Sequence, residues 1–502
     1  MQAGKNETVK TETKTLNYEL NYAELGLKAG VEIHQQLATQ KLFCCCPSQI
    51  RRDAPHFKIK RELRPLAGEL GKIDPAAIFE RKKRKYYIYE GYFDTNCLVE
   101  LDEEPPHEIN PEALKIALIV AKMLHCKFPD VLQVMRKTIV DGSNTSGFQR
   151  TVLIGTNGYL ETSFGKVGIQ SVALEEDAAR RIAEDSESVT FRLDRLGIPL
   201  IEISTTPDCH TPEQVREVAE KLGILLRATG KVARGLGTIR QDLNISISGH
   251  PRVELKGVQE LPHMPKIIEL EVKRQLDAIK SGQKLEPHVR NILPDLSSKF
   301  LRPMPGAARM YPETDLPLIF LDKKEIEKLE LPKTPEQLKS ELVSLGLSKD
   351  LVEQFVNSPY LNMFFEFVQK FNNLNPNLIA TTILIMPKEI RRKLQLPSFE
   401  LRKDELELLF KALSGGNKEI PAIVKESLPN VIEDFAKTKP KSFNEACAIL
   451  AKYKILSESE LKKEISKLKK EFKGPKEKLF GFIMGQLRGK ADPKKLAELI
   501  KE

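Results

Sequence analysis

The spacing of apolar residues changes near residue 330 of this 502-residue chain, and that change limits the folds it can adopt. Before it, short runs rich in Val, Ile and Thr alternate with Gly and Pro turns, which indicates strands with a few helices between them. After Leu331, apolar residues recur at helical spacing. We therefore expect an α+β fold, in which a mixed α/β domain is followed by helices only.

Individual segments can be assigned within this outline. Strands are expected at six runs in which apolar residues alternate or bunch together: 26–37, 131–140, 189–193, 198–205, 243–249 and 252–258. Two helices of the front part are marked by capping residues, at Asn110 before Pro111 and at Thr211 with Gln214. Further helix starts are expected at Thr334, Asp404, Ser442, Ser457 and Asp492.

The chain is too long for a single ordinary domain. We divide it into a polar leader at 1–16, an α/β domain at 17–330, a helical domain at 333–413 and a helical tail at 419–502, with SGGNKEIP at 414–421 as a linker. The leader lacks the apolar stretch of a signal peptide and is expected to be disordered. No apolar run approaches the roughly 20 residues that a membrane span needs. We expect a cytoplasmic protein with no membrane partner.

Positive charge is concentrated at the C-terminal end. The net charge is +9, and residues 430–502 hold 18 Lys and Arg against 11 Asp and Glu. Such a segment indicates a polyanionic partner, although it is also typical of a solvated helix face. The residues that we expect to contact a nucleic acid are Lys462, Lys463, Lys469, Lys470, Arg488 and Lys490.

The seven cysteines are an odd number scattered through a large chain, unlike a disulfide framework. The triplet Cys44, Cys45 and Cys46 could supply metal ligands together with Cys97. A structural zinc site normally shows two spaced pairs of ligands, however, and only one cluster is visible here. We therefore interpret the cysteines as ordinary reduced thiols.

Phosphate-binding motifs are absent. The chain has no GxxxxGK[ST] sequence, and GLGTIRQD at 235–242 lacks the third glycine of a dinucleotide fingerprint. If ATP is bound, a metal ion and carboxylates must hold it. Acidic residues in the strand-like runs are therefore the candidates for holding it.

Several polar residues do lie in those runs or in similar apolar surroundings. Glu32 and His34 are two apart, so on a strand both side chains project from the same face. Acids in apolar surroundings are costly unless they are paired or bound to metal. Others of this kind are Glu175, Glu176, Asp177, Glu202, Arg240, Asp242, Asn244, Glu254 and Lys256. If they converge, they form an oxygen-rich site suited to Mg²⁺. Taken singly, Glu202 could instead pair with Arg192 or Arg195, and His34 could be a hydrogen-bonded core histidine.

These residues lie in sequence blocks that resemble the signature blocks of the GatB/GatE family of tRNA-dependent amidotransferases. The blocks are, in order, GVEIHQQL, MRKTIVDGSNTSGFQR, LEEDAARRI, LDRLGIPLIEIS, TGKVARGLGTIRQDLNISI, VELKGVQEL and MPGAARMYPETDLP. They are most similar to the E subunit, which is the archaeal branch of the family. The C-terminal MGQLRGKADPKKLAELIKE resembles the YqeY-like tail of that family, so the resemblance runs from Gly30 to the end of the chain.

The resemblance implies a cradle-shaped, kinase-like α/β domain, then a helical domain and a tRNA-binding YqeY-like tail. It also implies a ligase reaction, in which ATP phosphorylates the γ-carboxylate of glutamate on tRNA(Gln). Ammonia delivered by an asparaginase-like partner, the D subunit of a hetero-oligomer, then displaces the phosphate. This chain shows no GxSxG, Ser-Lys or Thr-based amidase signature of its own.

The resemblance also implies particular site residues. The family's Mg²⁺-bearing catalytic cluster corresponds here to Glu32, His34, Glu176, Glu202 and Glu254. Phosphoryl transfer mainly requires charge neutralisation, so we expect Arg240, Asp242 and Lys256 beside the nucleotide. Three further basic residues of the signature blocks are candidates for contacts to phosphate or to the ammonia path: Arg136, Lys137 and Arg309.

Two departures from the family pattern stand out. The E subunit usually carries an aspartyl-tRNA-synthetase-like insert, and here only Ala278–Leu301 occupies that position. Bacterial B subunits often have two Cys pairs for zinc, which this chain lacks.

Two alternatives are a bacterial-type B subunit acting on both Glu-tRNA(Gln) and Asp-tRNA(Asn), and a tRNA-binding protein without catalysis. The DGSNTSGFQR and RPMPGAARMYPETD sequences argue against the first, and the intact acids argue against the second.

Overall fold

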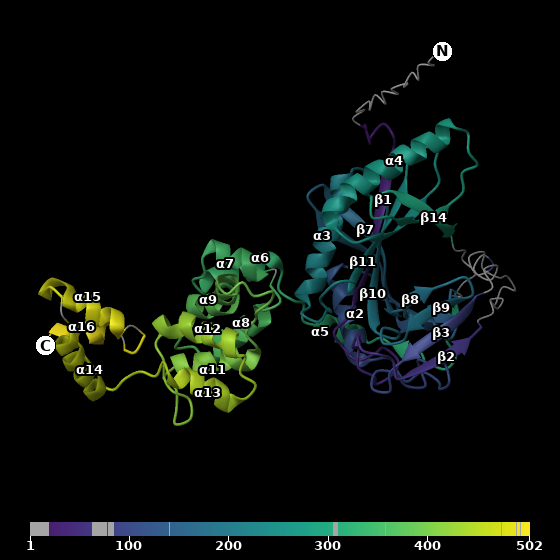
Figure 1. The fold of residues 1–502 in the computed structure, drawn as a ribbon. Coiled ribbons are helices and arrows are strands. Elements are labelled where there is room, and N and C mark those ends of the chain that lie inside the picture. Colours follow the sequence, from purple (N-terminus) through teal and green to yellow (C-terminus); the bar gives the residue numbers. More distant parts are fainter. Residues whose placement is uncertain are drawn as a thin grey trace, which may run out of the picture. The chain divides into compact units, whose positions relative to one another are not determined.

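The computed structural model describes residues 20–62, 78, 85–139, 141–304, 310–356, 358–472, 474–487, 489–491 and 493–501. The chain divides into two compact units, one ending at Pro332 and the other beginning at Lys333 (Figure 1). The leader expected at 1–16 lies outside the described residues. None of the described helices is long and apolar enough to cross a membrane.

A ten-stranded sheet forms the centre of the first unit (Figure 1). Neighbouring strands are antiparallel, except that β12 and β13 are parallel. In spatial order the strands are β14 (Ser298–Pro303), β13 (His288–Ile292), β12 (Val253–Val258), β11 (Ile239–Ser246), β1 (Lys28–Gln36), β10 (Pro199–Thr205), β7 (Gly165–Glu176), β6 (Phe148–Thr162), β5 (Val134–Thr138) and β15 (Met310–Pro312). The sequence predicted β1, β5, β10, β11 and β12 but missed the long β6–β7 hairpin.

Three helices pack against this sheet: α2 (Pro111–Met123), α3 (Pro212–Ala228) and α4 (Met264–Lys280). The side chains of Val31 and Ile33 on β1 are buried in the core with residues of these helices. Because successive side chains of a strand point to opposite faces, Glu32 and His34 lie on the other face. As predicted, the Asn110 side chain caps α2, and Thr211 and Gln214 form a capping box at α3.

A separate four-stranded sheet contains β2 (Phe57–Arg61), β3 (Tyr86–Gly91), β9 (Ser188–Arg192) and β8 (Arg180–Glu184), in that order. It has a small core of its own that includes Tyr89, Phe191 and Leu193. A two-stranded ladder joins β4 (Val131–Leu132) to β16 (Ile319–Phe320), and helix α5 (Lys323–Lys328) follows. The segment Ala278–Leu301 contains the end of α4, strand β13 and the start of β14.

The second unit is helical in all its described elements. They are α6 (Pro335–Ser344), α7 (Lys349–Val356), α8 (Leu361–Lys370), α9 (Pro376–Leu384), α10 (Met386–Lys393), α11 (Lys403–Leu413), α12 (Leu428–Thr438), α13 (Phe443–Ala451), α14 (Glu458–Glu471), α15 (Lys476–Gln486) and α16 (Pro493–Lys501). Helix starts at Thr334, Ser442 and Ser457 are as predicted. Helix α11 begins one residue before the predicted Asp404, because the Glu405 carboxylate caps the backbone N–H of Arg402.

The linker predicted at 414–421 does not separate two cores. Ile420 and Ile423, which follow the Gly415–Gly416 turn, are buried in the same core as the helices before them. Helices α12 and α13 also contribute to that core, through residues such as Val431 and Leu450. A second core begins only at Leu461 on α14. The predicted division therefore falls too early, because a glycine turn inside a packed core resembles a linker.

Candidate active site

Polar side chains cross the sheet on the face opposite helices α2 to α4. Strand pairing places Glu202 of β10 opposite His34, and Asp242 of β11 opposite Glu32. Arg240 lies opposite His34 on its other side, so β1 has an ionisable residue on both neighbouring strands. We call this set of side chains the polar face. From β5 to β12 it comprises Lys137, Glu175, Glu202, His34, Glu32, Arg240, Asp242, Glu254 and Lys256.

Three of the predicted residues meet at the middle of the polar face. His34 Nε2 lies 3.4 Å from Glu32 Oε1 and 3.2 Å from Glu202 Oε2. One donor atom from each residue lies within 4.8 Å of the other two. Their side chains are only 14%, 23% and 17% exposed for His34, Glu32 and Glu202. A hydrogen-bonded core histidine would make one such contact, and the second carboxylate beside His34 is what favours a metal site.

The ionisation of these three groups is interdependent. Burial raises the pKa of Glu32 to about 7, and the negative charge of Glu202 adds to that effect. Burial would lower the pKa of His34, but the hydrogen bond to Glu202 and the charges of Glu202 and Glu32 raise it to about 9. The centre of the polar face thus stabilises a positive charge strongly.

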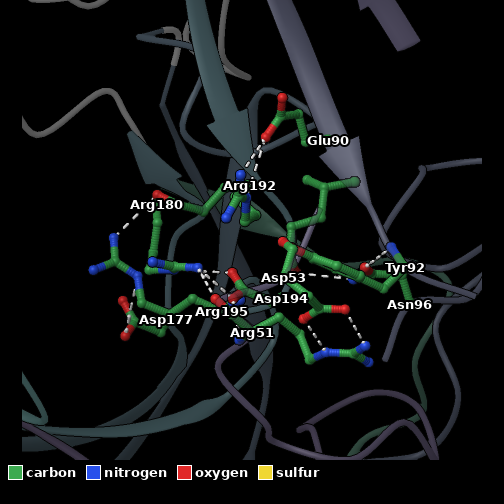
Figure 2. Close-up of polar contacts among 12 residues, drawn as sticks. Arg51, Asp53, Glu90, Tyr92, Asn96, Asp177, Arg180, Arg192, Asp194 and Arg195 are labelled. Carbon is green, nitrogen blue, oxygen red and sulfur yellow. Dashed lines mark hydrogen bonds and ion pairs between the residues drawn. The ribbon is translucent and has the colours of Figure 1, made fainter. Parts of the chain in front are cut away.

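Glu202 is also held by a lysine. Lys137 Nζ lies 3.5 Å from Glu202 Oε2 and forms a short ion pair with Glu175. Burial opposes ionisation of Glu202, but the charge of Lys137 and the hydrogen bond from His34 hold its pKa well below the usual range. The interpretation of Glu202 as a partner of Arg192 or Arg195 is wrong, since both arginines have other partners (Figure 2).

Glu175, rather than Glu176, shares the polar face with Glu202. Strand β7 pairs with β10 so that Leu200 lies opposite Glu175, which directs Glu175 to the side of Glu202. Glu176 therefore points to the other face, where Arg150 donates its backbone N–H to Glu176 at 3.1 Å. The predicted convergence does not include Glu176. Both residues stand in the sequence LEED, and only the strand register distinguishes them.

Glu254 and Asp242 are joined by Lys256 at the β12 end of the polar face. Lys256 Nζ lies 2.7 Å from Asp242 Oδ2 and 2.5 Å from Glu254 Oε1. Glu254 is thus ion-paired and is not one of the three convergent residues. Arg240 donates to Asp177 at 2.9 Å. Arg136 and Arg150 both donate to the buried Glu313, and Arg309 lies outside the described residues.

The charge balance of the polar face favours a bound cation. This face includes five carboxylates, against the positive charges of Lys137, Lys256, Arg240 and a protonated His34, so negative charge is in excess. Carboxylate oxygens and one imidazole, facing a half-buried space, are donors that suit Mg²⁺ or Mn²⁺. Glu32, His34 and Glu202 therefore fit a divalent ion, with Glu175 beside them.

A second group of side chains that could hold a metal ion involves the cysteines. One donor atom each of Cys44, Cys46, Cys97 and Glu100 lies within 4.8 Å of the others. Hydrogen bonds from Cys44 and Cys46 hold the pKa of Cys97 well below its usual range. These three thiols lie close enough to share one ion, which the interpretation of the cysteines as ordinary thiols did not anticipate. Three thiols and a carboxylate suit tetrahedral Zn²⁺. The sequence signal was a CxC at 44–46 followed by a CxxE at 97–100.

Some of the basic residues predicted in the tail lie close together. Lys462, Lys463 and Lys470 line a shallow depression on α14 together with Ser466 and Lys467. Lys469 is exposed on the same helix, and Lys490 is exposed between α15 and α16. Arg488 lies outside the described residues.

If Glu202 is a metal ligand and Glu176 is not, substituting them should affect metal binding differently. Glu202→Gln should raise the dissociation constant for Mn²⁺, measured by electron paramagnetic resonance, by at least about tenfold because a charged ligand is lost. Glu176→Gln should leave it within about twofold, since Glu176 lies on the opposite face of the sheet. An equal loss in both variants would contradict the assignment.

Metal analysis can test whether Cys44, Cys46, Cys97 and Glu100 hold an ion. We expect the full chain to bind one equivalent of Zn²⁺, and Cys97→Ser to lose it because only three of the four ligands remain. The matched control is Cys45→Ser, which removes an exposed thiol outside the group. Zinc that survives Cys97→Ser, or that is lost in the control, would show that the ion is held elsewhere.

Comparisons with known proteins agree on one family. Residues 27–327 match the model of the GatB/GatE catalytic domain. The E subunit of a glutamyl-tRNA(Gln) amidotransferase from Methanocaldococcus jannaschii is 38% identical, over 96% of this chain and 99% of that protein. Proteins of the same name from Methanococcus maripaludis and Pyrobaculum aerophilum are each 35% identical, over 94% of this chain and 97% and 98% of theirs. The chain therefore belongs to the GatB/GatE family.

Proposed function

We propose that this chain activates and amidates the glutamate of misacylated Glu-tRNA(Gln), as the E subunit of a tRNA-dependent amidotransferase. ATP phosphorylates the γ-carboxylate, and ammonia then replaces the phosphate to give Gln-tRNA(Gln). The names of relatives that align along almost the whole chain support the substrate. The single observation that carries the chemistry is the meeting of Glu32, His34 and Glu202 on the polar face.

The polar face can carry out the first step with little covalent help. When bound between Glu32, His34 and Glu202, Mg²⁺ would neutralise charge on the transferring phosphate. Lys137 keeps Glu202 ionised, and its own charge lies beside the site. Arg240 and Lys256 add positive charge on β11 and β12, where the nucleotide phosphates would lie. Asp242 holds Lys256 in place.

The assignment of the domains follows from the same proposal. The sheet with its polar face would be the kinase-like cradle, and the basic helices at the C-terminus would be the YqeY-like tail that binds tRNA. The alignment with the Methanocaldococcus protein spans 637 positions, so that relative has residues without a counterpart here. We place the missing insert at Ala278–Leu301, the segment in which α4 is followed by the β13–β14 hairpin.

Ammonia must come from a partner under this proposal. The described residues of the polar face include no serine or threonine that is activated by a base for amide hydrolysis. An asparaginase-like D subunit would supply ammonia within a hetero-oligomer. The activated glutamate would then react before water reaches it.

The nitrogen donor tests this division of labour. The purified chain, with ATP and ammonium chloride, should convert Glu-tRNA(Gln) to Gln-tRNA(Gln), whereas glutamine or asparagine should support turnover only after the D subunit is added. His34→Ala should lower the ammonium-dependent rate by at least about a hundredfold. The control His107→Ala, at an exposed site, should not change it.

The outcomes of that assay are distinct. Turnover with glutamine by the chain alone would refute the proposal. Equal turnover of Asp-tRNA(Asn) would identify a bacterial-type enzyme instead. Binding of tRNA without any ATP-dependent product would indicate a protein that only binds tRNA.

The tail generates a separate prediction. The triple variant Lys463→Glu, Lys467→Glu and Lys470→Glu should raise the KM for Glu-tRNA(Gln) by about tenfold and reduce its dependence on salt, since phosphate contacts release counterions. The kcat should be unchanged. A control variant reverses three exposed lysines elsewhere in the second unit: Lys349, Lys388 and Lys403. An equal rise in KM in both variants would show that the tail holds no specific tRNA contact.

A further inference from the structure

A buried aspartate lies where the polar face ends. Asp177 follows directly after β7 and has no exposed surface. Its carboxylate accepts hydrogen bonds from Gln36 Nε2 at 2.6 Å and from Arg240 Nη2 at 2.9 Å. Arg195 Nε lies 3.7 Å from the Asp177 oxygen that Gln36 binds. Two guanidinium groups therefore share one carboxylate.

The backbone around Asp177 fixes the direction of Arg195 (Figure 2). The Arg195 guanidinium donates to the carbonyl oxygens of Ala178 at 2.7 Å and Ala179 at 3.0 Å. Its backbone N–H donates to buried Asp194 at 2.9 Å. Asp194 also accepts two hydrogen bonds from Arg180, so the charge of Arg180 is already balanced. Arg195 is thus held rigidly, and the Asp194 carboxylate, whose charge raises the pKa of Arg195, is already paired with Arg180.

The pair Arg195 and Arg240 leaves an excess of positive charge. Among the described residues, Asp177 is the only carboxylate that forms an ion pair with either guanidinium. Burial lowers the pKa of Arg195; Asp177 opposes this effect, and the charges of Arg240 and Arg180 add to it. Two half-buried guanidinium groups with a single counterion favour a second anion between them.

This excess charge lies beside the candidate metal site. Arg240 is opposite His34 on the neighbouring strand, and Gln36, which binds Asp177, is two residues beyond His34 on β1. Two residues of a strand span about 7 Å. A polyphosphate or a nucleic acid strand can bridge that distance, whereas a small carboxylate cannot.

We propose that Arg195 and Arg240 bind a phosphate group of a substrate and that Asp177 is a positioning residue that orients both. Guanidinium groups bind phosphate oxygens through paired N–H donors, and most of the Arg240 donors have no partner among the described residues. The inference rests on the proposed function, because it assumes that a phosphate is transferred at Glu32, His34 and Glu202. The phosphate could belong to ATP or to the tRNA backbone.

The two sources can be separated with the full chain. Dissociation constants for ATP and for uncharged tRNA(Gln) are measured by equilibrium binding, and KM values by the ammonium-dependent assay. Arg195→Gln and Arg240→Gln should each weaken ATP binding by about tenfold or more if the site takes a nucleotide phosphate. The same loss for tRNA, with ATP binding intact, would assign the site to the tRNA backbone. Unchanged binding of both ligands would overturn the proposal.

A matched control is available nearby. Arg192 also belongs to this cluster of arginines, but it donates to Glu90 through Nε at 3.1 Å and Nη2 at 2.8 Å (Figure 2). Arg192→Gln should therefore leave both dissociation constants within about twofold. A loss equal to that of Arg195→Gln would mean that general positive charge, rather than this site, attracts the ligand.

The positioning role of Asp177 has its own readout. Asp177→Asn should raise the KM for the substrate that the site binds, with kcat close to wild type, because the arginines lose their orientation while the metal ligands remain. A fall in kcat with unchanged KM would contradict this role. Tripolyphosphate binding separates the two proposals. If the wild-type chain catalyses nothing but binds tripolyphosphate through Arg195, the proposed function fails and the phosphate site stands.

Discussion

The repulsion among carboxylates on one face of the ten-stranded sheet is the constraint on which the candidate site depends. Glu32, Glu202 and Glu175 are held close together in a half-buried setting, where burial raises the pKa of Glu32 and Glu175, while Lys137 and His34 hold the pKa of Glu202 well below its usual range. Lys137 and a protonated His34 compensate part of that charge. Strand alternation makes the arrangement possible, since Val31 and Ile33, which alternate with Glu32 and His34 along β1, point into the core.

The polar face is negatively charged at its centre and positively charged at one end. Its centre attracts a divalent cation, and Arg195 and Arg240 favour an anion about two residues farther along β1. A metal-bound polyphosphate carries both kinds of charge, so it matches this order. The cluster of Cys44, Cys46, Cys97 and Glu100 has a different role. Glu100 forms an ion pair with Lys41 and accepts a hydrogen bond from the backbone of Cys97, and so it joins two distant loops. A metal held there would stabilise the fold rather than take part in the chemistry.

Local pattern accounts for what could be predicted from the sequence. Glu32 and His34 were identifiable because they lie two positions apart within an apolar strand, and most helix starts because capping residues mark them. Glu175 could not be distinguished from Glu176, since the register between β7 and β10 decides which one faces Glu202. The β6–β7 hairpin was missed because its glycines and threonines interrupt the apolar pattern. Glu100 and Asp177 depend on contacts between distant segments, which no local pattern contains.

The central claim is that the γ-carboxylate of the substrate attacks ATP at the polar face, and isotope transfer tests it most directly. Glutamate labelled with ¹⁸O in its γ-carboxylate is charged onto tRNA(Gln) and incubated with the chain, ATP and ammonium chloride. The inorganic phosphate is then analysed by mass spectrometry. If the carboxylate is phosphorylated and ammonia breaks the carbon–oxygen bond, one ¹⁸O atom appears in phosphate for each Gln-tRNA(Gln) formed. Unlabelled phosphate alongside amidated product would contradict the account.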